Sequence, residues 1–169
     1  KSYAHFVEGL EGQAPPYLVI AGGIFKYEDH NARRFRRIIA ESGQEKNVVL
    51  TGFYEDKYAY SLIKNALFTI HLSLYEGFGF SVAESMYAGI PVIAHNGSSY
   101  LEVVKDGGIL VEGRSIEQVS EAMNRLFSDP SYREQLGRRG EKSARRFTWE
   151  RTATETYKVF ERVYNRYLK

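Results

Sequence analysis

Short apolar runs alternate with longer amphipathic segments along most of the chain. Runs of strand length are predicted at residues 17–21, 47–50, 67–74, 90–94 and 108–111. Segments with helical periodicity are predicted at residues 3–10, 29–42, 56–65, 81–88, 116–127, 131–146 and 150–167. Strands that alternate with amphipathic helices are typical of a parallel sheet covered by helices. The pattern therefore predicts an α/β fold: a Rossmann-like parallel sheet with helices on both faces.

Three of the predicted helices carry start signals. Ser115 with Gln118, and Ser81 with Glu84, have the spacing of a capping box, in which two side chains accept hydrogen bonds from backbone N–H groups of the first turn. Asp129 precedes Pro130, and proline suits the first helical position. These signals predict helices that begin near residues 81, 116 and 131.

Composition places limits on what the chain can be. Its 169 residues, with 43% apolar and 26% charged, are ordinary for a single globular domain, which we assign to residues 1–169. A net charge of +2 is too small to indicate a nucleic-acid binder, and the four arginines within residues 33–37 favour a solvated helix face. The absence of cysteine excludes disulfides and thiolate metal sites and fits a protein of the reducing cytoplasm. No apolar run approaches the length of a membrane span.

The segment 73–91, SLYEGFGFSVAESMYAGIP, carries the strongest chemical signal. A glycine loop that runs from a strand into a helix gathers backbone N–H groups and the positive end of the helix dipole, which together hold a phosphate. Glu76 and Glu84 bracket this loop, and each carboxylate can accept hydrogen bonds from sugar hydroxyls. Each piece alone has a structural explanation, as a turn glycine, a solvated glutamate or a capping box. Together they predict a nucleotide-sugar site.

The same segment resembles the retaining glycosyltransferases of family 4, which have the GT-B fold. Their hallmark is two glutamates separated by seven residues within a phrase like SxxEGFGxxxxEAMxxGxPVI; Ser85 stands here where the family usually has alanine. The resemblance continues in NVVLTGF at residues 47–53, GGILV at 107–111, SDP at 128–130, LG at 136–137 and FTWE at 147–150. It covers nearly the whole chain.

The resemblance implies a role for particular residues. Glu76 would face the transferred sugar as the catalytic residue, and Glu84 would bind the ribose. Lys1 would either neutralise the pyrophosphate or be a frayed terminal residue. Because ligands in open α/β sheets bind at the carboxyl ends of strands, the loops at residues 22–23 and 51–54 are expected at the same crevice, with base contacts among them. The donor-binding residues so expected are Lys1, Gly22, Gly23, Phe53, Tyr54, Phe78, Gly79, Phe80, Ser81, Val82 and Glu84.

The implied reaction is transfer of a hexose, mannose or glucose, from a donor such as GDP-mannose or UDP-glucose to a glycan or lipid-linked acceptor, with retention of configuration. Lipopolysaccharide or other glycan biosynthesis would be its setting. The sequence shows no Asp-x-Asp motif and no metal-binding histidine spacing, so we expect no metal and no cofactor. His71 is either a catalytic residue or, more simply, a hydrogen-bonded histidine at a strand end. Two alternatives stay open: a non-catalytic nucleotide-binding module and a GT-B epimerase.

The resemblance also implies a missing half. Family members begin this domain with a strand, whereas the present chain opens with a predicted helix, so the first strand and an N-terminal acceptor-binding domain are expected upstream of Lys1. Residues 150–169 would cross to that domain with a stripe formed by Tyr157, Phe160, Tyr164 and either Tyr167 or Leu168. The isolated chain is therefore expected to be inactive, and any peripheral contact with the inner face of the cell membrane would come from the missing half.

Overall fold

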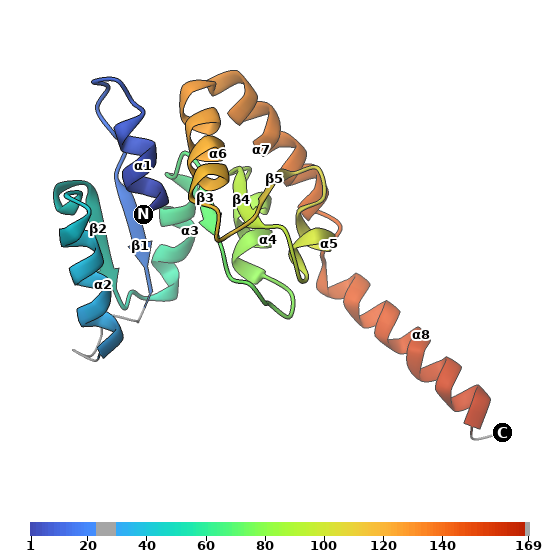
Figure 1. Ribbon diagram of the computed structural model, residues 1–169. Helices are drawn as coiled ribbons and strands as arrows, with labels where there is room; N and C mark the ends of the chain where they lie inside the picture. Colours follow the sequence, from blue (N-terminus) through green and yellow to red (C-terminus); the bar gives the residue numbers. More distant parts are fainter. Residues whose placement is uncertain (23–29, 168–169) are drawn as a thin grey trace.

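The structure is a computed structural model that describes residues 1–22 and 30–167. Its strands are β1 (Leu18–Ala21), β2 (Val48–Gly52), β3 (Thr69–His71), β4 (Val92–His95) and β5 (Gly108–Val111). Its helices are α1 (Ser2–Glu8), α2 (His30–Glu41), α3 (Ala59–Lys64), α4 (Phe80–Tyr87), α5 (Tyr100–Val104), α6 (Ile116–Ser128), α7 (Pro130–Ala144) and α8 (Trp149–Tyr167). Short 3₁₀ turns, η2 (Glu45–Asn47) and η3 (Asp56–Tyr58), precede β2 and α3. The alternation of strands and helices confirms the predicted α/β class (Figure 1).

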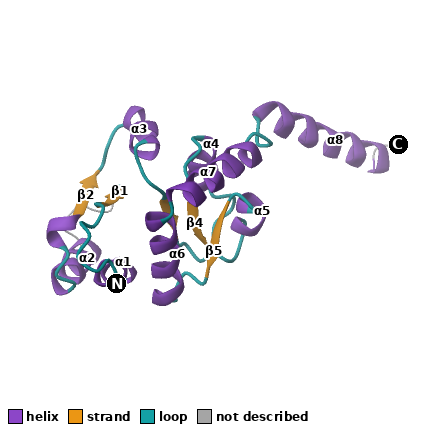
Figure 2. Ribbon diagram, turned by 90° about the horizontal axis from the view of Figure 1, so that it is seen from above, coloured by secondary structure: helices purple, strands orange, loops and turns teal. Residues whose placement is uncertain are grey.

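All described strand pairs are parallel, but the strands form two sheets instead of one. β1 pairs with β2, and β4 lies between β3 and β5. The view from above shows the β1–β2 pair standing apart from β4 and β5 (Figure 2). The expectation of a single sheet is therefore wrong for the described residues, because no ladder joins β1 to β3.

Helices cover both faces of the three-stranded sheet, as predicted, and β4 shows why. Successive side chains of a strand point to opposite faces. Ile93 joins a core cluster with residues of α1 and α6, whereas Val92 and Ala94 join a second cluster with residues of α4, α5 and α7. All three side chains are fully buried, so β4 is the centre of the domain.

One predicted element is shorter than expected, and one element of the structure was not predicted. The strand expected at residues 67–74 is confined to Thr69–His71, because residues 72–79 form a loop. Helix α5 was not predicted at all, since its five residues are too few to show a helical period. The expected helix at 56–65 is found as η3 followed by α3.

The predicted helix starts lie within one residue of those found, but the predicted capping side chains are present only at α6 and α7. The Ser115 hydroxyl accepts from the Gln118 N–H at 3.2 Å, and the Asp129 carboxylate accepts from the Tyr132 N–H at 2.8 Å. Helix α4 instead begins after Gly79, whose φ of 91° lies in the left-handed region, and no side chain caps it. Ser81 is thus the second residue of the helix, and the proposed capping box with Glu84 is wrong.

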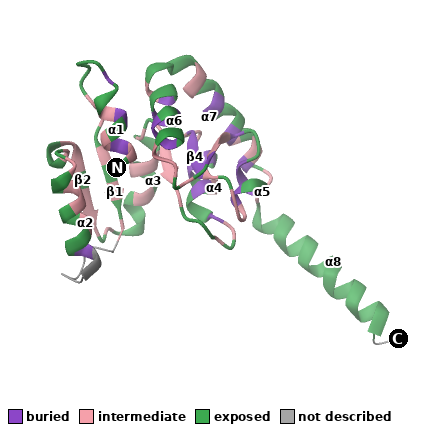
Figure 3. Cartoon of the chain, viewed as in Figure 1, coloured by how far each residue is buried: buried purple, intermediate pink, exposed green. Residues whose placement is uncertain are grey.

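Helix α8 extends away from the rest of the domain with no buried residue (Figure 3). Its aromatic stripe is open to solvent: Tyr157 is 62%, Phe160 65%, Tyr164 57% and Tyr167 68% exposed. The prediction that this stripe has no partner in the present chain is confirmed for these four residues. Leu168 lies outside the described residues.

Candidate functional site

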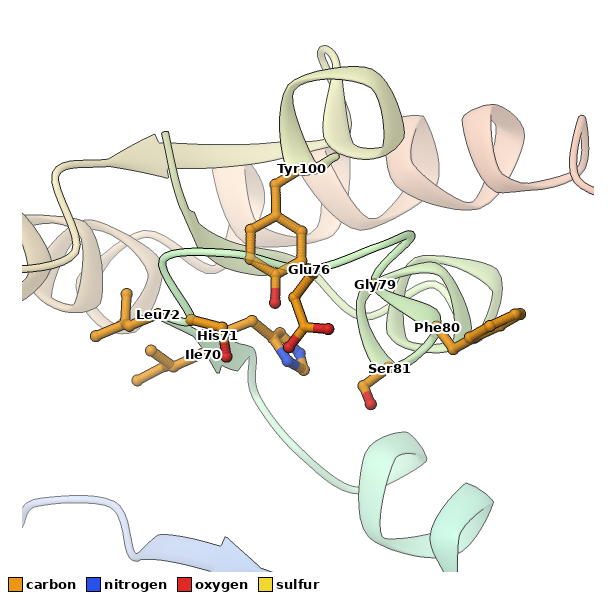
Figure 4. A pocket seen from close by; sticks show the side chains of 9 residues that line it. Ile70, His71, Leu72, Glu76, Gly79, Phe80, Ser81 and Tyr100 are labelled. Atoms are coloured by element: carbon orange, nitrogen blue, oxygen red, sulfur yellow. The ribbon is translucent and has the colours of Figure 1, made fainter. Parts of the chain in front are cut away.

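A pocket of about 310 Å³ opens where β3 ends and α4 begins (Figure 4). The end of β3, the glycine loop and the start of α4 supply most of its wall, and α5 adds one residue. The lining residues are Ile70, His71, Leu72, Ser73, Glu76, Gly79, Phe80, Ser81 and Tyr100. The pocket lies at the carboxyl end of a parallel strand, where open α/β sheets bind their ligands.

The backbone at the start of α4 faces this pocket. The first N–H groups of a helix have no intrahelical acceptor. In α4 the turn closes with the N–H groups of Val82 and Ala83, which both donate to the Gly79 carbonyl at 3.1 Å. The N–H groups of Gly79, Phe80 and Ser81 precede these bonds, and the same three residues line the pocket. The arrangement can hold an anion through backbone dipoles.

Gly79 has two reasons to be glycine. Its φ of 91° is strained for any residue with a side chain. In addition, a Cβ at this position would lie 2.6 Å from Cε1 of Tyr100, whose ring is buried beneath the loop. The loop therefore passes closer to its support than a side chain would allow.

The structure brings together only part of the predicted site. Glu76, Gly79, Phe80 and Ser81 line the pocket, with the Glu76 side chain seen beside Tyr100 in Figure 4. Glu84 is exposed one turn after Phe80 on α4 and is not in the lining.

Two of the predicted N–H donors are placed differently. Val82 is fully buried and its N–H donates to the Gly79 carbonyl, which contradicts its assignment as a phosphate donor. The side chain of Phe78 packs against Phe80 and Phe147 with ring centroids 5.0 Å apart in each pair, and Phe78 is not among the lining residues.

The predicted residues of the other sheet do not reach this pocket. Gly22 follows β1, while Phe53 and Tyr54 follow β2, and none of them is among the lining residues. Lys1 is exposed at the start of α1 and is also outside the lining. Gly23 lies outside the described residues. None of the nine lining residues is lysine or arginine, so the expected basic side chains are not part of the described pocket.

His71 is one of the residues that line the pocket, and its side chain is hydrogen-bonded. Its Nε2 lies 3.1 Å from the Thr69 hydroxyl. Burial lowers the His71 pKa to about 4, although the negative charge of Glu76 acts in the opposite direction. The imidazole is therefore neutral near pH 7, which agrees with the simpler of the two interpretations of this residue.

Three residues around the site, Ser98, Ser99 and Tyr100, were missed by the sequence analysis. The Ser73 side chain acts on the Tyr100 hydroxyl and lowers its pKa, and the Tyr100 ring lies against Gly79. Ser98 and Ser99 bond to the backbone of Glu76 from the loop after β4. No local motif marks these residues, because their contacts join positions 21 to 27 residues apart; only the order of β3 and β4 as neighbours in the sheet could have suggested them.

The described residues hold no candidate metal site and no membrane span, and they form a second pocket. No group of three or more His, Cys, Asp or Glu side chains within residues 1–22 and 30–167 could hold a metal ion. A second pocket of about 550 Å³ lies between α5 and the start of α8, and it contains none of the predicted site residues. None of the described helices combines the length and apolarity needed to cross a membrane.

The model of the family "Glycosyl transferases group 1" matches residues 5–143 of this chain. The chain belongs to this family. Among curated relatives, it is 29% identical over 145 residues to O-antigen chain mannosyltransferase B of Escherichia coli, a match that covers 86% of the chain and 37% of that protein. It is also 30% identical over 135 residues to an alpha-1,3/1,6-mannosyltransferase of Dictyostelium discoideum, covering 77% of the chain and 32% of that protein. The chain thus spans about a third of the length of these relatives.

The fold of this family member also matches a solved structure. The Anabaena protein Alr3699/HepE, solved in complex with UDP-glucose, superposes with a TM-score of 0.81 at 18% identity, over 95% of this chain and 44% of that one. At such low identity the match shows the fold alone.

Proposed function

We propose that this chain is the C-terminal, nucleotide-sugar-binding half of a retaining hexosyltransferase of glycosyltransferase family 4. One observation supports the proposal: the residues that begin α4 and Glu76 line a single pocket. The first can hold a diphosphate and the second can hold a sugar hydroxyl. A group that must bind both is a nucleoside diphosphate sugar.

The residue roles follow from this placement. The diphosphate lies against Gly79, Phe80 and Ser81, and the transferred sugar lies against Glu76. Glu84, exposed on the same helix four residues after Phe80, is within reach of a ribose outside the pocket. The donor is GDP-mannose or UDP-glucose; the mannosyltransferase names of both curated relatives support the first. The acceptor is a glycan or a lipid-linked glycan.

The division of the strands into two sheets supports the proposal of a missing first strand. Along the described chain, β1 and β3 each carry an unpaired parallel edge, while α1 and α6 share one core cluster with Leu18 of β1 and Ile70 of β3. One further parallel strand, followed by α1, would complete a sheet in the order β2-β1-new-β3-β4-β5 with the usual right-handed crossover. Such a strand would bring the loops of Gly22 and Phe53 to the same sheet edge as Glu76, and a basic side chain from it would complete the phosphate site.

The exposed stripe of α8 supports the proposal of an N-terminal domain. A contiguous aromatic face open to water is typical of an interaction surface. The relatives are more than twice as long as this chain, so their additional residues are sufficient to form a second domain. We propose that α8 lies against that domain in the full-length protein and that the isolated chain binds the donor but transfers nothing.

Calorimetry with UDP, GDP and ADP tests the donor site and identifies the base. Glu84→Ala is expected to weaken binding of a bare nucleoside diphosphate by about 1.5–3 kcal/mol, because a charged hydrogen-bond partner is lost. Glu76→Ala is expected to change it little, because the sugar is absent from that ligand. Glu134→Ala, a surface carboxylate on α7, is the matched control. Equal losses for Glu76→Ala and Glu84→Ala contradict these roles.

The same titrations in EDTA test the assignment of the diphosphate to backbone N–H groups. Binding is expected to persist, and an absolute requirement for magnesium or manganese would overturn the assignment.

Incubation of the chain with UDP-glucose or GDP-mannose and glycan acceptors separates the half-enzyme proposal from an autonomous enzyme. Formation of glycosidic product by this chain alone would refute the former.

A further inference from the structure

The backbone of Glu76 is held by hydroxyl groups from the loop that follows β4. The Ser98 hydroxyl accepts from the Glu76 N–H at 3.0 Å and donates to the Glu76 carbonyl at 2.7 Å. The Ser99 hydroxyl donates to the same carbonyl at 3.0 Å. The backbone N–H and carbonyl of Glu76 are thereby both bonded to side chains that lie 22 and 23 residues further along the chain.

These hydrogen bonds are important because residues 72–79 belong to neither a helix nor a strand. No ladder or helical turn therefore sets the backbone of Glu76. Ser98 adopts a φ of 53°, in the left-handed region that serine rarely occupies. The two hydrogen bonds to Glu76 offset the cost of that conformation, which ties the shape of the loop after β4 to the position of Glu76.

Tyr100 holds the other end of the glycine loop. Tyr100 is 3% exposed, its ring packs under Gly79, and the Ser73 side chain at the start of the loop acts on its hydroxyl. Burial and the charge of Glu76 raise the Tyr100 pKa, while the Ser73 side chain lowers it, so the hydroxyl stays protonated near pH 7. In Figure 4 the ring stands next to the Glu76 side chain at the wall of the pocket.

We infer that Ser98, Ser99 and Tyr100 act together as a clamp that sets the position of Glu76 against the sugar of the bound donor. This inference rests on the proposed function, because it assumes that Glu76 contacts the sugar. The clamp residues are positioning residues, since they act through Glu76 and the glycine loop. A carboxylate must be held to within about 0.5 Å to be effective, and an irregular loop requires fixed neighbours to achieve that.

Amide hydrogen exchange in the ligand-free protein tests the clamp directly. Ser98→Gly removes the hydroxyl while glycine keeps the left-handed backbone at no cost. We expect exchange of the Glu76 N–H to become at least about tenfold faster, because a hydrogen bond of about 1.4 kcal/mol corresponds to that factor. Ser128→Ala is the control: it removes a hydroxyl that donates to the Asn124 carbonyl at 2.7 Å on α6, far along the chain. This control should leave the Glu76 N–H unchanged.

Calorimetry then tests whether the clamp serves sugar recognition. For wild type, Ser98→Gly, Ser99→Ala and Tyr100→Phe, affinities are compared for UDP against UDP-glucose and for GDP against GDP-mannose. We expect the variants to lose about three- to tenfold in affinity for the sugar nucleotide and less than about twofold for the bare diphosphate. A merely structural role would weaken both ligands equally.

The outcomes separate the two proposals. Unchanged exchange of the Glu76 N–H in Ser98→Gly overturns the clamp, as do equal losses for sugar nucleotide and bare diphosphate. If wild type binds none of the four probes, the proposed function fails, and the positioning role that depends on it fails as well, even where the exchange data show the hydrogen bonds. If Ser98→Gly does not fold, Ser99→Ala and Tyr100→Phe decide the matter by the calorimetric comparison of sugar nucleotide with bare diphosphate.

Discussion

The two sheets of this domain are built from similar sequence but reach very different states. In β4, the residues Val92, Ile93 and Ala94 are fully buried between helices on both faces. In β1 and β2 no residue is fully buried, and Val19 and Val49 are 47% and 42% exposed. The difference follows from neighbours: β4 has a strand on each side and helices above and below, whereas β1 and β2 form an isolated pair.

The comparison explains which half of the predicted site is assembled. Carboxyl ends of parallel strands converge only when the strands share a sheet. Glu76, Gly79 and Ser81 belong to the loop and helix that follow β3 of the three-stranded sheet, and all three line one pocket. Gly22 and Phe53 follow strands of the other sheet and stay outside it. The complete predicted site therefore requires that the strands before Gly22, Phe53 and Glu76 belong to one sheet, in addition to the sequence motif around Glu76.

Glycines at the ends of the two sheets give the largest expected contrast. Gly79→Ala should lower the free energy of unfolding by about 3 kcal/mol, because a left-handed alanine costs about 1–2 kcal/mol and its Cβ must also displace the Tyr100 ring. Gly52→Ala, at a φ of 64° with no atom near its Cβ, should cost only about 1 kcal/mol. Urea denaturation measures both, and an equal loss would mean that the Tyr100 contact is unimportant.

Matched valine substitutions compare the interiors of the sheets. Val92→Ala should destabilise the protein by about 2 kcal/mol, since it removes methyl groups from a fully buried position. Val49→Ala, at a residue that is 42% exposed, should cost less than about 1 kcal/mol. If residues preceding Lys1 add the proposed strand, the cost at Val49 should rise in the longer polypeptide. A cost that stays the same would argue against completion of the sheet.

The pH dependence of stability gives a smaller contrast that involves only the three-stranded sheet. The unfolded His71 takes up a proton near its ordinary pKa of 6.5, whereas the folded one does so near 4. Stability is therefore full above pH 6.5 and falls as the pH decreases toward 4, with about 1–2 kcal/mol lost between pH 7 and pH 5. His71→Gln should remove this part of the slope in urea titrations at several pH values. An unchanged slope would show that His71 is not the buried group responsible.

Sequence patterns predicted local features well. The strands around Leu18, Val48 and Ile93 and the caps of α6 and α7 depend on neighbours within a few residues, so the period of apolar residues and the capping side chains were sufficient. The capping box at Ser81 failed because a positive φ at Gly79 began the helix earlier. Position 79 has no room for a side chain because of the Tyr100 ring, which lies 21 residues further along the chain.

The sequence by itself determined the α/β alternation, the glycine loop before α4 and the Glu76-to-Glu84 spacing on which the family resemblance rests, because each is contained in consecutive residues. Tertiary structure alone decided that Ser98, Ser99 and Tyr100 support Glu76, that Val82 is enclosed, and that Gly22 and Phe53 stand apart from the pocket. These outcomes depend on which strands become neighbours. Strand order is a property of the whole sheet, and no local pattern of residues encodes it.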